Sequence, residues 1–233
     1  MKKTVLFDFG GTLVYYFERP EFPEILKQAI TEVQDYLRKE GLLCISPQAM
    51  WQRVRDEDHE AEDYRVRPLE ERLARIFQLD EKVQSSGLII TVCRVFMKPI
   101  FARGYCYEDT LSTLERLKSK GVSSAIVSNT TWGSPAALWR EEIERFGLTE
   151  YMETVVFCRD VGWRKPAPQI FAYTLKKLQA LPQDSLFVGD TPKWDFEGPK
   201  ALGIEPVLID RRGVMKDFPQ ETIKTLGDLL DRL

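Results

Sequence analysis

The stretch Asp8-Phe9-Gly10-Gly11-Thr12-Leu13 follows directly on a short apolar run, Thr4–Phe7, near the start of the chain. An apolar run of this length is typical of a strand that is buried in a parallel sheet. An acid at the end of such a strand, followed by two glycines, lets the backbone turn sharply and approach a ligand closely. The stretch therefore indicates a ligand site at the end of a buried strand.

Further short apolar runs bounded by turn residues predict the rest of the sheet: Ser123–Val127, Thr154–Phe157, Ser185–Val188 and Pro206–Ile209. Helical spacing of apolar residues marks three segments near them: Thr110–Lys120, Ala136–Phe146 and Gln169–Leu178. Strands that alternate with helices are typical of an α/β fold with a doubly wound parallel sheet. We therefore expect helices on both faces of one sheet.

The interval from about Tyr16 to Phe101 breaks this alternation. Apolar residues recur at helical period between Ile25 and Leu37 and again between Leu69 and Phe77, which predicts a helical insert. No internal repeat, low-complexity tract or Pro-rich linker separates this interval from the rest of the chain. We therefore expect the insert and the sheet to share an interface.

Polar residues stand at the ends of three predicted strands. Asp8 follows the first, Ser128-Asn129 the second and Asp190 the fourth. Ligands of doubly wound sheets bind at the carboxyl ends of the strands. These side chains are therefore expected to converge on one edge of the sheet.

With these residues in place, the chain resembles the haloacid dehalogenase (HAD) superfamily, whose four motifs occur in order. Motif one resembles Asp8–Leu13, motif two Ala125–Asn129, motif three Lys165-Pro166-x-Pro168 and motif four Gly189–Asp195. The resemblance implies a Rossmann-like HAD core, formed by residues 1–15 and 102–233. It also implies that residues 16–101 are an inserted α-helical cap domain.

The resemblance implies a magnesium-dependent phosphohydrolase that acts on a small phosphorylated metabolite. Asp8 would attack phosphorus and form a covalent aspartyl-phosphate, which divides one difficult hydrolysis into two displacements. Asp8, Asp190 and the backbone carbonyl of Gly10 would hold Mg²⁺, a cation that prefers oxygen ligands.

The remaining motif residues would bind and neutralise the phosphoryl group, since phosphoryl transfer depends mainly on positioning and charge. Ser128 and Lys165 would act directly in catalysis, Lys165 by a fixed positive charge. Asp195 would orient a metal-bound water or Lys165. The predicted substrate-binding residues are Gly11, Thr12, Ser128, Asn129 and Lys165.

Gly10 departs from the superfamily pattern. Phosphatases of the superfamily usually carry a second aspartate at this position, which serves as general acid and base. Its loss removes a contribution of roughly 10²- to 10⁴-fold and leaves the proton donor open. Haloacid dehalogenases also lack this aspartate, but they work without metal and without the Gly-Asp pair of motif four, whereas Gly189-Asp190 is present. A third possibility is a catalytically silent module that keeps the phosphate and metal pocket.

Composition limits the partners. Lys and Arg number 33 against 36 Asp and Glu, so no basic surface for nucleic acid is expected. The apolar run before Asp8 is too short for a signal sequence or a membrane span. The four cysteines form no C-x-x-C pair, so we expect reduced thiols. We expect a cytoplasmic monomer or homodimer.

The sequence leaves two possible roles for the aromatic residues near the motifs and for the basic residues of the insert. Trp132, Trp163 and Trp194 could line a substrate pocket or pack between loops. Basic residues of the insert could bind an anion or form a solvated helix face: Arg53, Arg55, His59, Arg65 and Arg67.

Overall fold

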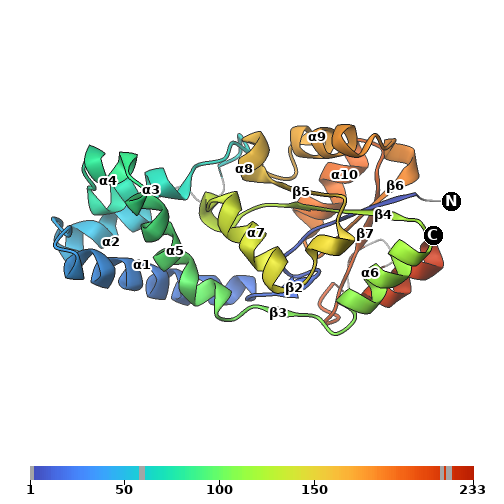
Figure 1. Ribbon diagram of the computed structural model, residues 1–233, viewed down its shortest axis with the longest axis horizontal. Helices are drawn as coiled ribbons and strands as arrows, with labels where there is room; N and C mark the ends of the chain where they lie inside the picture. Colours follow the sequence, from blue (N-terminus) through green and yellow to red (C-terminus); the bar gives the residue numbers. More distant parts are fainter. Residues whose placement is uncertain (1–2, 58–60, 216–217, 219–221) are drawn as a thin grey trace.

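A five-stranded parallel sheet forms the centre of the computed structural model, which describes residues 3–57, 61–215, 218 and 222–233. The strand order is β5-β4-β1-β6-β7 (Figure 1). The strands are β1 (Thr4–Phe7), β4 (Ser123–Ser128), β5 (Thr154–Phe157), β6 (Ser185–Gly189) and β7 (Glu205–Leu208). The chain starts in the middle and winds outward to each side, so the predicted doubly wound sheet is confirmed. The strand at the carboxyl-terminal edge was predicted one residue too late, at Pro206–Ile209.

Helices cover both faces of the sheet (Figure 1). On one face lie α8 (Cys158–Val161), α9 (Pro168–Leu178) and α10 (Glu197–Ala201), and on the other α6 (Thr110–Ser119) and α7 (Ala136–Arg145). The alternation of side chains along β1 explains the two layers, because Leu6 belongs to one buried cluster and Val5 and Phe7 to the other. The sheet is therefore buried on both faces.

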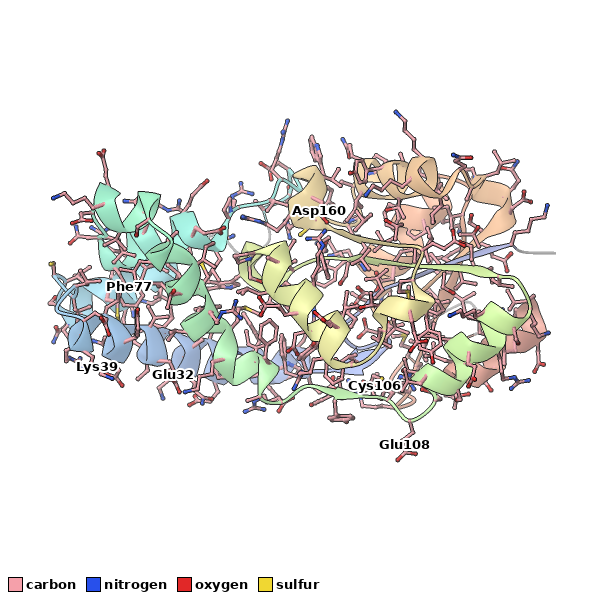
Figure 2. All side chains as sticks on the ribbon, viewed as in Figure 1. Glu32, Lys39, Phe77, Cys106, Glu108 and Asp160 are labelled. Atoms are coloured by element: carbon pink, nitrogen blue, oxygen red, sulfur yellow. The ribbon has the colours of Figure 1, made fainter. Side chains whose placement is uncertain are left out.

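The interval between motifs one and two is helical, as predicted, and its helices form a lobe at one end of the molecule (Figure 1). Its helices are α1 (Phe22–Lys39), α2 (Pro47–Asp56), α3 (Leu69–Phe77), α4 (Glu81–Ser85) and α5 (Leu88–Phe101). Figure 2 shows Phe77 inside this lobe, while Glu32 and Lys39 extend from α1. We call residues 16–101 the helical insert. Its role as a cap domain stays a prediction.

Two antiparallel strands, β2 (Val14–Tyr15) and β3 (Tyr105–Cys106), carry the chain into and out of the helical insert. Next to them the Tyr16 hydroxyl donates to Glu142 of α7 at 3.0 Å, and Arg145 donates to the Phe101 carbonyl at 3.2 Å. One cluster of buried apolar side chains continues from the sheet into the insert. The two parts therefore share an interface, as the absence of a linker suggested.

Shorter elements complete the structure. A π-helical turn spans Pro192–Phe196 and is separated from β6 by two residues. Short 3₁₀ helices occupy Arg19–Glu21, Thr131–Gly133, Thr149–Tyr151, Pro182–Asp184 and Leu226–Arg232. Among the described residues, no helix combines the length and the apolar character that a membrane span requires.

Candidate active site

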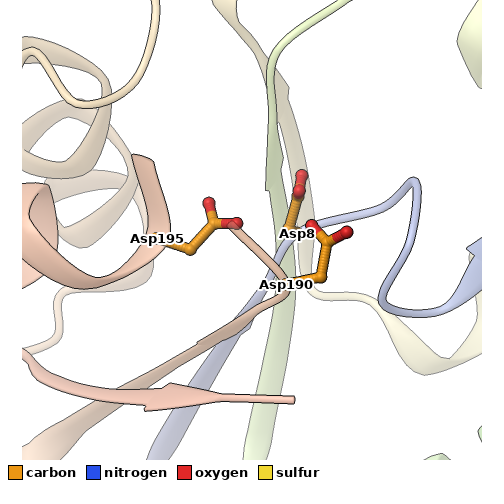
Figure 3. Close-up of side chains that lie close together, drawn as sticks. All are labelled: Asp8, Asp190 and Asp195. Carbon is orange, nitrogen blue, oxygen red and sulfur yellow. The ribbon is translucent and has the colours of Figure 1, made fainter. Parts of the chain in front are cut away.

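Three carboxylates meet at the carboxyl ends of the central strands (Figure 3). Asp8 follows β1, Asp190 follows β6, and Asp195 lies in the π-helical turn. One oxygen of each lies within 4.8 Å of the others. Asp8 and Asp195 are buried and Asp190 is half-buried. Residues nearly two hundred positions apart in the sequence thus form one acidic cluster.

Lys165 is the cation of this cluster. Its Nζ lies 2.8 Å from Asp8 Oδ1 and 2.6 Å from Asp195 Oδ1, and its side chain is fully buried. Burial acts to lower the pKa of Lys165, but the two carboxylates outweigh it and hold the pKa above its ordinary value. Lys165 therefore carries a fixed positive charge against Asp8.

Both oxygens of Asp195 are occupied by the protein. Oδ1 accepts from Lys165 Nζ at 2.6 Å, and Oδ2 accepts from the Thr191 amide at 2.9 Å. A Cβ at Gly189 would lie only 2.3 Å from Asp195 Cγ, so only glycine lets the carboxylate pack against the end of β6. Asp195 thus links Lys165 to the turn after β6, whereas Asp8 and Asp190 are the acids that the sequence assigned to the metal.

The charges of the cluster do not balance. Three carboxylates face one ammonium group, and burial is the main cause that raises the pKa of Asp190 to about 7 and that of Asp195 to about 6. The negative charges of Asp195 and Asp8 add to the effect on Asp190. A divalent cation fits this donor set, because its ligands would be hard carboxylate oxygens and its charge would offset the excess.

The two glycines of motif one have different surroundings. Gly11 has a φ of +82°, and a Cβ there would lie 2.2 Å from Asp190 Oδ2. Gly11 therefore lets the backbone approach Asp190, and its amide donates to the Val14 carbonyl at 2.8 Å. Among the described residues, a Cβ at Gly10 would meet only Tyr16 Cδ2, at 3.7 Å. The backbone at Gly10 thus has room for a side chain.

Motif two contacts motif three. The Asn129 Oδ1 accepts from the Lys165 amide at 2.8 Å, and its Nδ2 donates to the Lys165 carbonyl at 3.2 Å. The Ser128 hydroxyl donates to the Asn129 carbonyl at 3.1 Å. The side chain of Asn129, which the sequence assigned to substrate, is thus engaged with Lys165.

Thr12 is fully buried below the site, and its carbonyl accepts from Arg211 Nη2 at 2.8 Å. Arg211 also forms a two-pronged ion pair with Asp109, with both N–O distances at 3.0 Å. Sequence reasoning assigned no role to this pair, because the two residues lie 102 positions apart. Arg211 therefore supports the backbone of motif one from the loop after β7.

The tryptophans near the motifs contact basic or aromatic side chains of residues 16–101. Trp163 lies under the guanidinium of Arg65 at 4.0 Å, and Trp194 lies under that of Arg19 at 4.3 Å. Trp132 stacks on Phe96 with ring centroids 5.4 Å apart. These three residues pack between loops and the helical insert. Of the basic residues of the insert, Arg53 and Arg67 bind groups within the insert, and His59 lies outside the described residues.

A family model for haloacid dehalogenase-like hydrolases matches residues 2–203, which include all four motifs. The chain belongs to the haloacid dehalogenase-like hydrolase family. This membership agrees with the doubly wound sheet and with the order of the four motifs.

Single proteins of known name or structure are similar to this chain at 22–32% identity. The chain is 32% identical over 134 residues to the ribulose-1,5-bisphosphate 5-phosphatase of Halopiger xanaduensis, over 53% of this chain and 54% of that protein. The alignment thus spans about half the length of this relative. A HAD phosphatase from Thermococcus onnurineus is 26% identical, with a TM-score of 0.67 over 99% of this chain and 97% of that one. A 2-haloacid dehalogenase from Pseudomonas syringae shares the fold at 22% identity, with a TM-score of 0.72 over the same shares.

Proposed function

We propose that this chain is a magnesium-dependent phosphohydrolase that transfers the phosphoryl group of a small metabolite to Asp8. The contact that carries this proposal is that of Asp8 with Lys165, at 2.8 Å, beside the carboxylate of Asp190. A buried carboxylate that is held by a fixed cation and flanked by a metal ligand suits attack on a phosphoryl group.

The hydrogen bonds of Asp8 leave one oxygen for the attack. Its Oδ1 accepts from the Phe9 amide at 2.8 Å and from Lys165 Nζ. Among the described residues, none donates a hydrogen bond to Oδ2. We propose that Oδ2 forms the bond to phosphorus while the bond between phosphorus and the leaving oxygen breaks. Water would then hydrolyse the acyl-phosphate and restore Asp8.

Asp8, Asp190 and the backbone carbonyl of Gly10 would hold Mg²⁺. The bound ion would supply positive charge to the phosphoryl oxygens. Asp195 keeps Lys165 in place, because one of the Asp195 oxygens accepts from Lys165 Nζ and the other from the Thr191 amide. The Ser128 hydroxyl, which can rotate, and the amides after it would donate to a phosphoryl oxygen, together with the backbone of motif one at Thr12.

The proton donor for the leaving group is the open part of this mechanism. Tyr16 is the residue beside Gly10, but its hydroxyl donates to Glu142, and burial raises its pKa well above the ordinary range. Tyr16 is therefore excluded as the acid. We propose that water or the substrate supplies the proton, so turnover is slow unless the leaving group is a good one.

Dehalogenation is the second candidate function, because expulsion of a halide needs no acid and Gly10 provides none. The acidic cluster argues against it, because a metal-free site has no use for the excess negative charge of Asp190. A silent binding module would use Lys165 to bind phosphate, but it would not need the unengaged oxygen of Asp8. Sugar phosphates are the first substrates to test, because the relative from Halopiger xanaduensis is named for one.

Phosphate release from a panel that includes ribulose 1,5-bisphosphate and a triose phosphate, with and without Mg²⁺, tests the proposal. Halide release from 2-chloropropionate is measured in parallel. Phosphate release that requires Mg²⁺ supports the phosphohydrolase, whereas halide release without metal contradicts it. If neither product forms and phosphate raises the melting temperature only with Mg²⁺, the binding module is favoured.

A further inference from the structure

A loop of the helical insert lies against the loop that ends in Lys165. The insert loop lies between α2 and α3, and Figure 1 shows its part after residue 60 between the helical lobe and α8. Two backbone hydrogen bonds join the loops, from the Val66 amide to the Gly162 carbonyl at 3.0 Å and from the Arg164 amide to the Tyr64 carbonyl at 2.8 Å. We call residues 61–66 and 162–164 the latch. The latch is a short antiparallel pairing between the insert and the core.

Side chains strengthen the latch. Arg164 Nη2 donates to the Ala61 carbonyl at 2.8 Å, so Arg164 contacts the insert loop with both its main chain and its side chain. The Arg65 guanidinium lies over the Trp163 ring at 4.0 Å. Hydrogen bonds from a charged donor are stronger than neutral ones, so Arg164 is the residue whose replacement tests this contact.

The latch lies next to a residue of the active site. Lys165 follows Arg164 directly, and its main chain is held from the other side by Asn129. Lys165 is therefore fixed between two partners: Asn129 of the core and, through Arg164, the insert loop. Of these two partners, Asn129 belongs to the core, as Asp8 does, whereas the loop belongs to the helical insert.

Neighbouring contacts dock the insert on the same side. Glu70 of α3 pairs with Arg159 of α8 at 2.7 Å, and both side chains are largely buried. A Cβ at Gly133 would lie 2.1 Å from the Arg67 carbonyl, so the insert backbone passes directly over the core at this point. A shift of the insert relative to the sheet would therefore displace the latch and the Lys165 loop together.

We propose that Arg164 is a positioning residue, which ties Lys165 to the helical insert so that Lys165 is fully aligned with Asp8 only when the insert is docked. The proposal rests on the proposed function insofar as Lys165 serves phosphoryl transfer. A misplacement of about 1 Å in a reacting geometry can slow a reaction by about 10²-fold. Loosening the latch therefore reduces the rate of the chemical step more than it reduces substrate affinity.

Arg164→Ala removes the bond to the Ala61 carbonyl, Arg164→Lys keeps one charged donor, and Arg140→Ala is the matched control. Arg140 pairs with Asp160 within the core at 2.7 Å. Hydrogen exchange of peptides that cover residues 61–68 and 162–168 reports on the latch, and kcat and KM report on catalysis. For Arg164→Ala we expect faster exchange in both peptides, and a kcat about tenfold lower, as for the loss of one charged hydrogen bond, with a smaller change in KM. Arg164→Lys should restore part of both effects, and Arg140→Ala should leave both peptides and kcat unchanged.

Faster exchange with an unchanged kcat would overturn the positioning role, and unchanged exchange would overturn the latch itself. A second variant separates this inference from the proposed function. Asn129→Ala releases Lys165 from the core side, and in a coupled structure exchange should also become faster in residues 61–68, across the latch. If the protein releases no phosphate at all, this measurement still decides: a change confined to residues 162–168 contradicts the coupling.

Discussion

The side-chain amide of Asn129 pairs with the main chain of Lys165, accepting from its N–H at 2.8 Å and donating to its carbonyl at 3.2 Å. The two residues are 36 positions apart and belong to different motifs. The pair fixes the Lys165 backbone relative to the end of β4, from which Ser128 would contact a phosphoryl oxygen. The positions of these two groups are therefore not independent.

Asn129→Ala should lower both stability and activity. The variant loses two hydrogen bonds and leaves the Lys165 amide without this partner, which is expected to reduce the free energy of unfolding by about 1–3 kcal/mol. Displacement of Lys165 should lower kcat by roughly 10- to 100-fold. Urea denaturation and steady-state kinetics measure the two effects. Ser112→Ala, at an exposed site on α6, is the control and should change neither.

The Gly10→Asp variant should still fold, and it should hydrolyse its substrate faster than the parent. Within the part of the chain that the structure describes, the Cβ of the new residue would meet only Tyr16 Cδ2, at 3.7 Å, and the carboxyl group could act as general acid. A rise in kcat of about tenfold or more is expected, within the usual range for this kind of catalysis. The effect should be largest for poor leaving groups. An equal gain for good and poor leaving groups would contradict the assignment of the missing proton donor to position 10.

Gly11→Ala is the matched comparison for that variant, because it adds a side chain one residue further on. There a Cβ would lie 2.2 Å from Asp190 Oδ2, on a backbone with a φ of +82°. The free energy of unfolding should fall by about 1–3 kcal/mol, and Mg²⁺ binding should weaken. If Gly10→Ala lowers the free energy of unfolding as much as Gly11→Ala does, the conclusion that Gly10 has room for a side chain is wrong.

The stability of the metal-free protein should depend on pH through Asp190. Burial raises the pKa of Asp190 to about 7 in the folded chain from an ordinary value of 3.8, so the folded state keeps a proton that the unfolded state loses. The contribution of this group is therefore present below about pH 4 and is lost as the pH rises toward about 7. Mg²⁺ bound at Asp190 would replace the proton, so the rise in melting temperature on adding Mg²⁺ should be larger at pH 8 than at pH 6.

The control for this pH dependence is Asp231→Asn, at an exposed position near the carboxyl terminus, which should behave like the parent. Asp190→Asn should show a smaller fall in stability with pH and no stabilisation by Mg²⁺. A melting temperature of Asp190→Asn that still rises with Mg²⁺ would place the metal elsewhere.

Lys165→Met should be strongly destabilising, because it leaves the buried carboxylates of Asp8 and Asp195 without their cation. Removal of one partner of a buried ion pair costs about 3–5 kcal/mol. The double variant Lys165→Met/Asp195→Asn removes one of those charges and should recover part of the loss. Denaturation with urea measures both. Lys176→Met, on the exposed face of α9, should stay within about 0.5 kcal/mol of the parent.

Much of the fold could be predicted from local pattern. The strand runs are short and apolar on both faces because the sheet is covered on both sides, so β1 and β5 were placed with the bounds that the structure shows. The pair β2 and β3 was missed, since two-residue strands leave no periodic pattern. The helix α5 is apolar nearly all round, so its face could not be assigned.

The geometry of the site was only partly accessible. Acids that follow parallel strands converge by topology, which explains why Asp8 and Asp190 could be placed together. The partners of Asn129 and Arg164 could not be foreseen, because they come from loops whose paths depend on tertiary packing. The signal for the latch was the position of Trp163 and Arg65, which sequence alone could not bring together.

The most direct test of covalent catalysis is intact-protein mass spectrometry after acid quench of the enzyme with a phosphorylated substrate and Mg²⁺. The mechanism predicts a species heavier by one phosphoryl group, located on the peptide that contains Asp8, absent without Mg²⁺ and absent in Asp8→Asn together with all turnover. Phosphate release that persists in Asp8→Asn would contradict a covalent aspartyl-phosphate on Asp8.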